Sequence, residues 1–139
     1  MLTGYRVLDI TQFVAGPTCT RIMAEMGAEV IKVELAPNGD HGRQSGLRAR
    51  GDGNEDYTQS TYFAQHNHSK KSLAIDLKNL RGQDLIKKML PKIDVLVENF
   101  APGAIARMGL SYDVLKEINS RLIMCSISMA GQSGPLSQQ

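Results

Sequence analysis

The hydrophobic positions of the chain fall into short apolar runs separated by amphipathic or polar stretches. The central run is Val95–Val97, which follows Asp94 and ends on Glu98. An apolar run of this length between polar residues is typical of a strand buried on both faces of a parallel sheet. Similar runs occur in four further segments, which are residues 6–10, 29–34, 71–76 and 121–127. The pattern therefore predicts five strands.

Helical patterns lie between these runs. The clearest is residues 80–90, whose apolar side chains recur at helical spacing. Shorter helical segments are predicted at residues 18–26, 60–65, 102–108 and 112–118. Pro17 suits the first turn of a helix, where its missing N–H would have no partner, and Gly27 suits a left-handed cap. The first strand, its helix and the second strand thus form one βαβ unit.

Strands that alternate with helices predict an α/β fold. We expect a three-layer domain with a mainly parallel, doubly wound sheet, and a single domain over residues 1–139. Residues 35–59 show neither the helical nor the strand period of apolar positions and are rich in Gly, Asn, Asp and Arg. This pattern predicts a long mobile loop over the mouth of the sheet. The chain ends just after a Gly-rich turn at residues 128–135, and we expect it to be a fragment of a larger fold.

Composition and charge narrow the class of protein. The net charge of +2 and the lack of long basic runs argue against nucleic-acid binding. Residues 1–9 have no secretory pattern, and no apolar run reaches the ~20 residues of a membrane span. Two cysteines are too few for a disulfide framework or a zinc site. We expect a cytoplasmic protein that does not bind membranes.

Charged residues gather where the predicted strands end, which is where ligands bind in parallel sheets. Four strands end on carboxylates, which are Asp9, Glu34, Asp76 and Glu98. These carboxylates suit either acid–base chemistry and ribose binding, or the capping of the following helices by accepting backbone N–H groups. Six cations lie in or beside the same loops, which are Lys32, Arg43, Lys70, Lys71, Lys78 and Arg107. Single cations around a cleft favour a small phosphate-bearing ligand, or are ordinary surface charge.

Several familiar sites are absent or incomplete. A dinucleotide turn needs three glycines, but the first turn offers only Gly16, followed by proline. The calcium-loop pattern that begins at Asp52 lacks its glycine and its last acid. His66 and His68 have no third metal ligand at a suggestive spacing, and Cys19 has no nearby base. We therefore expect no metal site and no nucleophile of this kind.

Eight motifs follow one another along nearly the whole chain. They are GYRVLDITQFVAGPTCT (4–20), MGAEVIKVE (26–34), GD (39–40), KKSLAIDLK (70–78), DVLVENFAPG (94–103), RMGL (107–110), NSRLI (119–123) and GQSGP (131–135). Together they resemble the class III CoA-transferase family, whose relatives include alpha-methylacyl-CoA racemases. Departures are small, with Met129-Ala130 in place of the usual Gly-Phe and Ser120 in place of the usual Pro.

The resemblance implies a Rossmann-like domain that binds coenzyme A. The family's CoA contacts would fall on Val14, Ala15, Leu35, Ile75, Asp76, Leu77, Lys78, Asn99, Phe100, Ala101 and Arg107. Arg107 and Lys78 would meet phosphates, Asn99 would hydrogen-bond, and the apolar residues would enclose the adenine or the pantetheine arm. Val14 and Leu35 replace the Gln and Arg of the formyl-CoA branch, which favours a substrate other than the formyl/oxalyl pair.

The resemblance also implies a reaction. In the transferases an aspartate attacks the acyl-CoA thioester and forms a mixed anhydride before CoA passes to another carboxylic acid. That aspartate is expected beyond Gln139, so the present chain would hold no catalytic residue and would be inactive alone. Coenzyme A and acyl-CoA would be substrates rather than bound cofactors, and the whole protein would be an interlocked homodimer. Alternatives are the same portion of a racemase, whose His and Asp also lie beyond Pro135, and a catalytically silent CoA-binding module.

Overall fold

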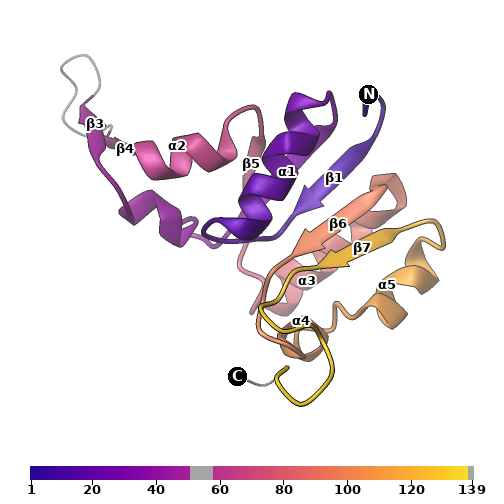
Figure 1. Cartoon of the computed structure of the whole chain (residues 1–139). Helices are drawn as coiled ribbons and strands as arrows, with labels where there is room; N and C mark the ends of the chain where they lie inside the picture. The colour runs from indigo at the N-terminus through magenta and orange to yellow at the C-terminus, as the bar shows by residue number, and fades with distance from the viewer. Residues whose placement is uncertain (51–57, 138–139) are drawn as a thin grey trace.

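A five-stranded sheet in which every neighbouring pair is parallel forms the centre of the protein. The computed structural model describes residues 1–50 and 58–137 (Figure 1). The strands are β1 (Arg6–Asp9), β2 (Glu29–Glu34), β5 (Lys71–Ala74), β6 (Val95–Glu98) and β7 (Ile123–Ser126). Their spatial order is β5-β2-β1-β6-β7. This arrangement confirms the predicted α/β fold and its mainly parallel sheet.

Helices connect the strands in the predicted alternation. They are α1 (Ala15–Glu25), α2 (Thr61–Asn67), α3 (Leu80–Met89), α4 (Ala104–Arg107) and α5 (Tyr112–Ile118), with 3-10 turns η1 (His41–Gln44) and η2 (Leu90–Lys92). Pro17 lies in the first turn of α1 as expected, but that helix begins at Ala15 rather than at Thr18. Gly27 follows α1 with φ of +100°, which confirms the predicted left-handed cap.

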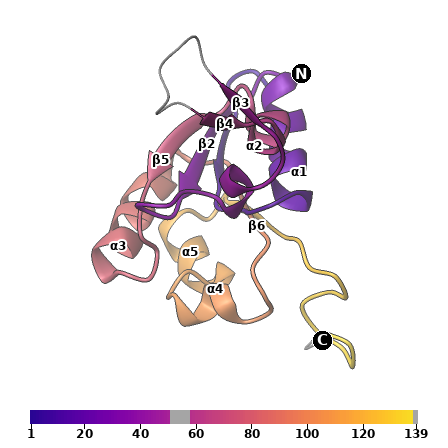
Figure 2. The same cartoon turned by 90° about the vertical axis from the view of Figure 1, so that its left-hand side faces the viewer.

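The core lies on both faces of the sheet, so the domain has three layers. On one face, Leu8 and Leu96 pack with Ile86 of α3 and Leu115 of α5. On the other face, Val7, Val30 and Val97 pack with residues of α1. Figure 2 shows α1 and α2 on one side of the sheet and α3, α4 and α5 on the other. Because side chains alternate along a strand, Asp9 shares the α1 face with Val7.

The segment 35–59 is more structured than the sequence pattern predicts. It contains η1, and a short antiparallel pair is formed by β3 (Arg48–Arg50) and β4 (Thr58–Ser60). Residues 51–57 of the predicted loop lie outside the described residues. Asp40 is buried and caps η1 by accepting a hydrogen bond from the Gly42 N–H at 2.7 Å. Side-chain bonds to the backbone hold this segment, and such bonds leave no hydrophobic period in the sequence.

The sheet has a topological switch point between β1 and β6. The chain leaves β1 toward β2 on one side, whereas β6 continues to β7 on the other side. Loops that diverge in this way leave a crevice at the carboxyl ends of the two strands, where parallel α/β sheets bind ligands. The residues after Asp9 and after Glu98 therefore define the candidate site.

Candidate functional site

The two loops at the switch point are joined by one side chain. The Gln12 N–H donates to Oδ1 of Asn99, and Nδ2 of Asn99 donates to the Gln12 carbonyl, both at 2.8 Å. This pair of bonds fixes the turn after β1 against the loop after β6. The side-chain amide of Asn99 is predicted from the sequence to hydrogen-bond a ligand. In the structure its oxygen and one of its N–H groups bond the backbone of Gln12 instead.

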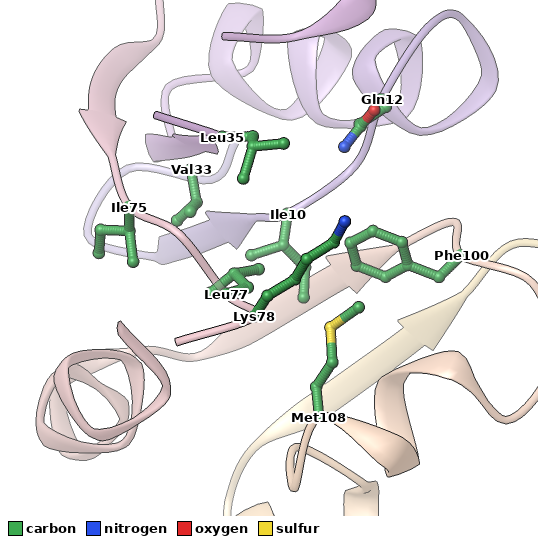
Figure 3. Close-up of a pocket in the computed structure, with 9 residues that line it drawn as sticks. All are labelled: Ile10, Gln12, Val33, Leu35, Ile75, Leu77, Lys78, Phe100 and Met108. Carbon is green, nitrogen blue, oxygen red and sulfur yellow. The ribbon is translucent and has the colours of Figure 1, made fainter. Parts of the chain in front are cut away.

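A narrow apolar slot opens beside this bridge (Figure 3). Its lining includes the predicted residues Leu35, Ile75, Leu77, Lys78 and Phe100. They come from the loops after β2, β5 and β6, far apart in sequence. Lys78, Phe100 and Met108 gather at one end of the slot, and Ile75 and Val33 lie toward the other (Figure 3). Its volume of about 70 Å³ is below the roughly 300–1,000 Å³ of a complete ligand pocket, so it would hold one part of a ligand.

A wider hollow lies on the other side of Phe100, and it contains three more predicted residues. Ala15, Asn99 and Ala101 line it together with residues that follow β7, and its volume is about 420 Å³. Phe100 lines both the slot and the hollow, so the two spaces adjoin at this residue. Together they follow the carboxyl ends of all five parallel strands.

The remaining predicted residues, Val14, Asp76 and Arg107, line neither space. Val14 is exposed at the start of α1, between residues that line the slot and the hollow. The Asp76 carboxylate accepts the Lys78 N–H at 2.9 Å and so shapes the turn that carries Lys78. Arg107 is exposed at the end of α4, and the next residue, Met108, lines the slot.

All four carboxylates predicted at strand ends accept backbone N–H groups, although β5 ends at Ala74, two residues before Asp76. The donors are Thr11 for Asp9, Asp40 for Glu34, Lys78 for Asp76 and Phe100 for Glu98, at distances from 2.8 to 3.1 Å. The acids therefore accept backbone N–H groups of turns, but the predicted capping of the following helices is wrong, because the N-caps of α1, α3 and α4 are Val14, Asn79 and Gly103. Asp9 and Glu98 are also fully buried, which removes them from direct contact with solvent.

The six cations divide into paired and unpaired groups. Lys70 lies 2.9 Å from Asp9, with side chains 2% and 0% exposed, and Lys32 lies 2.8 Å from Asp40. Arg43 pairs with Glu34 and Lys71 with Glu29. Among the residues that the structure describes, Lys78 and Arg107 have no ion-pair partner. These two are the predicted phosphate contacts, and their charges remain available to a ligand.

Burial and charge shift the ionisation of the groups beneath the crevice. Burial acts to raise the pKa of Asp9, but the charges of Lys32 and Lys70 and hydrogen bonds from Thr11 and Thr20 outweigh it and lower the pKa. Burial raises the pKa of the Cys19 thiol. Asp9 is therefore held as an anion, and Cys19 is held as an unreactive thiol.

The Glu34–Arg43 pair gives a pH prediction. Burial acts to raise the pKa of Glu34, but hydrogen bonds from Arg43 and Ser72 outweigh it, and the pKa falls from 4.5 to about 2. A lowered pKa in the folded state stabilises the protein above pH 4.5, and this stabilisation is lost as the pH falls toward 2. Because Arg43 is 41% exposed and solvent screens its charge, we expect Glu34→Gln to cost about 2 kcal/mol at pH 7.

Urea unfolding of the unaltered chain and of Glu34→Gln at pH 7 and pH 3 would measure this effect. The stability difference between them should shrink at pH 3, where the folded carboxylate approaches its pKa. Glu117→Gln, at an exposed position of α5, is the control and should differ little from the parent at either pH. A Glu34→Gln cost that is the same at both pH values would contradict the prediction.

Residues 1–50 and 58–137 hold no group of three His, Cys, Asp or Glu side chains able to bind a metal. His66 bonds Thr18 at 3.1 Å, and His68 lies 3.1 Å from Glu25. None of the helices described there has both the length and the apolar character that a membrane crossing requires.

An all-parallel sheet with a ligand crevice at its switch point defines a Rossmann-like α/β protein. A sequence model of CoA-transferase family III matches residues 2–139. The chain therefore belongs to CoA-transferase family III, as its motifs predicted.

Curated relatives with different substrate names are equally similar to this chain. A succinyl-CoA:glutarate CoA-transferase from Homo sapiens is 42% identical over 99% of this chain and 30% of the relative. A formyl-CoA:oxalate CoA-transferase from Rhodopseudomonas palustris (strain HaA2) is 42% identical over 94% and 29%. The chain thus spans about 30% of the length of these relatives. Overall identity does not separate the two substrate pairs.

Solved structures of similar sequence have the same fold. A CAIB/BAIF family protein from Brucella suis matches with a TM-score of 0.90 and 34% identity, over 99% of this chain and 35% of that one. Rv3272 from M. tuberculosis matches with a TM-score of 0.86 and 36% identity, over 99% and 37%. The fold described here is therefore shared with the corresponding third of larger proteins.

Sequence reasoning left out four residues that line the slot. They are Ile10, Gln12, Val33 and Met108. Ile10 and Gln12 directly follow β1, so the rule that ligands bind at strand ends could have found them. Met108 adjoins the predicted Arg107. Val33 lies within β2, and only the packing of the sheet shows that its side chain reaches the slot.

Proposed function

We propose that the crevice binds the CoA portion of an acyl-CoA in an enzyme that transfers CoA between carboxylic acids. The observation that carries this proposal is the convergence of the predicted contacts. Residues from the loops after β2, β5 and β6, far apart in sequence, meet around the Phe100 ring. Family membership over residues 2–139 supports the assignment of that shared site to CoA.

The slot and the hollow match the chemistry of this ligand. Coenzyme A combines a flat adenine and a thin pantetheine arm with several phosphates. An apolar slot between Leu35, Leu77 and Phe100 suits the flat or thin part. Lys78 at the slot and Arg107 beside it carry the charges that phosphates require.

The reaction proposed for the whole protein is CoA transfer through an aspartyl mixed anhydride. The family resemblance implies that its attacking carboxylate lies beyond Gln139, and the carboxylates of Asp9, Glu34, Asp76 and Glu98 hold backbone N–H groups instead. Acyl-CoA and a carboxylic acid would be the substrates, and the whole protein would act as a homodimer. The transferase names of the relatives favour this reaction over racemisation.

Arg107→Ala tests the phosphate contact. If the guanidinium meets a phosphate, its removal should weaken CoA binding by about 1–3 kcal/mol, or roughly 5- to 150-fold in Kd. Isothermal titration calorimetry of CoA against the unaltered chain and the variant would measure the change. Salt should also weaken binding less in the variant than in the parent, because one charge contact is gone.

Arg121→Ala is the matched control. Arg121 is also an exposed arginine, but it precedes β7 and so lies toward the amino ends of the strands, away from the crevice. Its loss should leave CoA affinity unchanged. An unaltered chain that fails to bind CoA would overturn the proposed function, whereas equal affinities for Arg107→Ala and the parent would remove only this contact.

A further inference from the structure

The turn after β1 contains a backbone conformation that its residue does not favour. Phe13 has φ of +67°, in the left-handed region, and its ring is about half exposed. A large side chain in this region costs free energy, so other parts of the structure must hold it there. Phe13 immediately precedes Val14 and Ala15, which are expected to contact CoA. The contacts that hold the Phe13 backbone therefore also position Val14 and Ala15.

Asp40 supplies the contact that holds the Phe13 backbone. Its Oδ1 accepts the Phe13 N–H at 3.3 Å and the Gly42 N–H at 2.7 Å. Its Oδ2 lies 2.8 Å from Nζ of Lys32. Asp40 and Lys32 are 2% and 1% exposed, so this carboxylate acts from inside the protein and does not reach a ligand in the crevice.

Lys32 extends the same contact to the other end of the turn. Its Nζ donates to the Thr11 carbonyl at 2.8 Å while it pairs with Asp40. The two buried side chains thus bind the backbone on both sides of Gln12. On the opposite side of the turn, Asn99 bonds both the N–H and the carbonyl of Gln12.

His41 adds a second contact from the same segment. Its ring stacks on that of Phe13, with centroids 5.4 Å apart and an angle of 16° between the planes. Residues 40–41 therefore contact both the backbone and the side chain of Phe13. A segment that looks like a surface loop in the sequence is packed against the turn proposed to bind CoA.

We propose that Asp40 is a positioning residue for CoA binding. It holds Phe13 in its left-handed conformation through its Oδ1 acceptor, and so presents Val14 and Ala15 to the ligand. This inference rests on the proposed function, because it assumes that the turn after β1 contacts CoA. The negative charge of Asp40 pairs with Lys32, whereas its Oδ1 acceptor positions the Phe13 backbone.

Two double variants separate the acceptor from the charge. Lys32→Met with Asp40→Asn removes both charges and keeps an oxygen acceptor for the Phe13 N–H. Lys32→Met with Asp40→Leu removes the charges and the acceptor, and keeps the same branched framework of side-chain heavy atoms. We expect calorimetry to show CoA affinity within about threefold of the parent for the Asn variant, and a loss of about tenfold for the Leu variant.

Phe13→Gly provides the rescue. Glycine adopts a positive φ without the steric penalty of a side chain. Added to the Leu double variant, it should restore most of the CoA affinity, whereas it should not restore the thermal stability lost with the buried contacts. A purely structural role of Asp40 would move affinity and stability together in all these variants.

Amide hydrogen exchange at Phe13 measures the positioning without a ligand. Exchange should be slow in the parent and the Asn variant, and faster in the Leu variant. Equal CoA affinities and equal Phe13 exchange in the folded Asn and Leu variants would overturn the inference. If the unaltered chain does not bind CoA although Phe13 exchanges slowly, the proposed function fails instead, and the role in CoA binding falls with it.

Discussion

Lys70→Met is expected to lower the free energy of unfolding by about 3 kcal/mol or more. Lys70 and Asp9 form a buried pair at 2.9 Å, and Nζ of Lys70 also donates to the Pro17 carbonyl and to Oδ1 of Asn67. Methionine fills much of the same volume but leaves Asp9 without its nearest cation. Asp9 keeps its hydrogen bonds from Thr11 and Thr20, but removal of one partner of a buried ion pair costs far more than the loss of a surface contact.

The neighbouring lysine is a matched control for this prediction. Lys71 also forms an ion pair, with Glu29, but its side chain is 70% exposed. Lys71→Met should therefore change stability by less than about 1 kcal/mol. Urea unfolding of both variants under the same conditions would measure the contrast. Similar losses for the two variants would show that burial does not govern the strength of the Asp9–Lys70 pair.

Gly82→Ala is expected to destabilise the protein by about 3 kcal/mol, the upper range for an overpacked core. A Cβ at Gly82 would lie 2.1 Å from the Asp76 carbonyl oxygen and 2.9 Å from Cγ2 of Ile75. The first contact involves backbone, which cannot rotate away as a side chain can. Relief of the clash would move α3 away from the turn that carries Leu77 and Lys78, so CoA affinity should fall as well.

The predicted loss of stability in Gly82→Ala is opposite in direction to the usual effect of this substitution. In an exposed helix, the same substitution stabilises by about 1 kcal/mol because alanine favours helix more than glycine does. Arg81→Ala, at the neighbouring exposed position of α3, should change stability by less than about 0.5 kcal/mol. Thermal or urea unfolding of both variants would measure the effects. An unchanged or raised stability for Gly82→Ala would contradict the close approach of α3 to Asp76.

The strands and several helices could be predicted because their signals are local. The apolar run of residues 29–34 and the helical pattern of residues 112–118 match β2 and α5 residue for residue. The start of α1 could not be predicted in this way, since Ala15-Gly16-Pro17 also reads as a turn. A Cβ at position 16 would lie only 2.3 Å from side-chain carbons of Thr11. This close packing against the turn after β1 favours glycine there.

The sequence predicted which loops form the candidate site, but it did not predict which of the charged side chains there are buried in ion pairs. Strand-end reasoning correctly indicated that the loops bearing Lys78 and Phe100 would meet. It could not distinguish Lys32 and Lys70 from Lys78, because all three are lysines in or beside the predicted strands. Burial beside Asp40 and Asp9 makes the first two part of the framework, and that difference depends on contacts between distant segments.

The Asn99 bridge has a consequence for how such proteins can diversify. The bridge uses only backbone atoms of Gln12, whereas at position 99 it needs one donor and one acceptor on a short side chain. Aspartate lacks the donor and leucine lacks both groups. Natural variation can therefore alter side chain 12, which lines the slot, while the bridge stays intact. Selection should hold residue 99 nearly invariant and leave residue 12 freer to change.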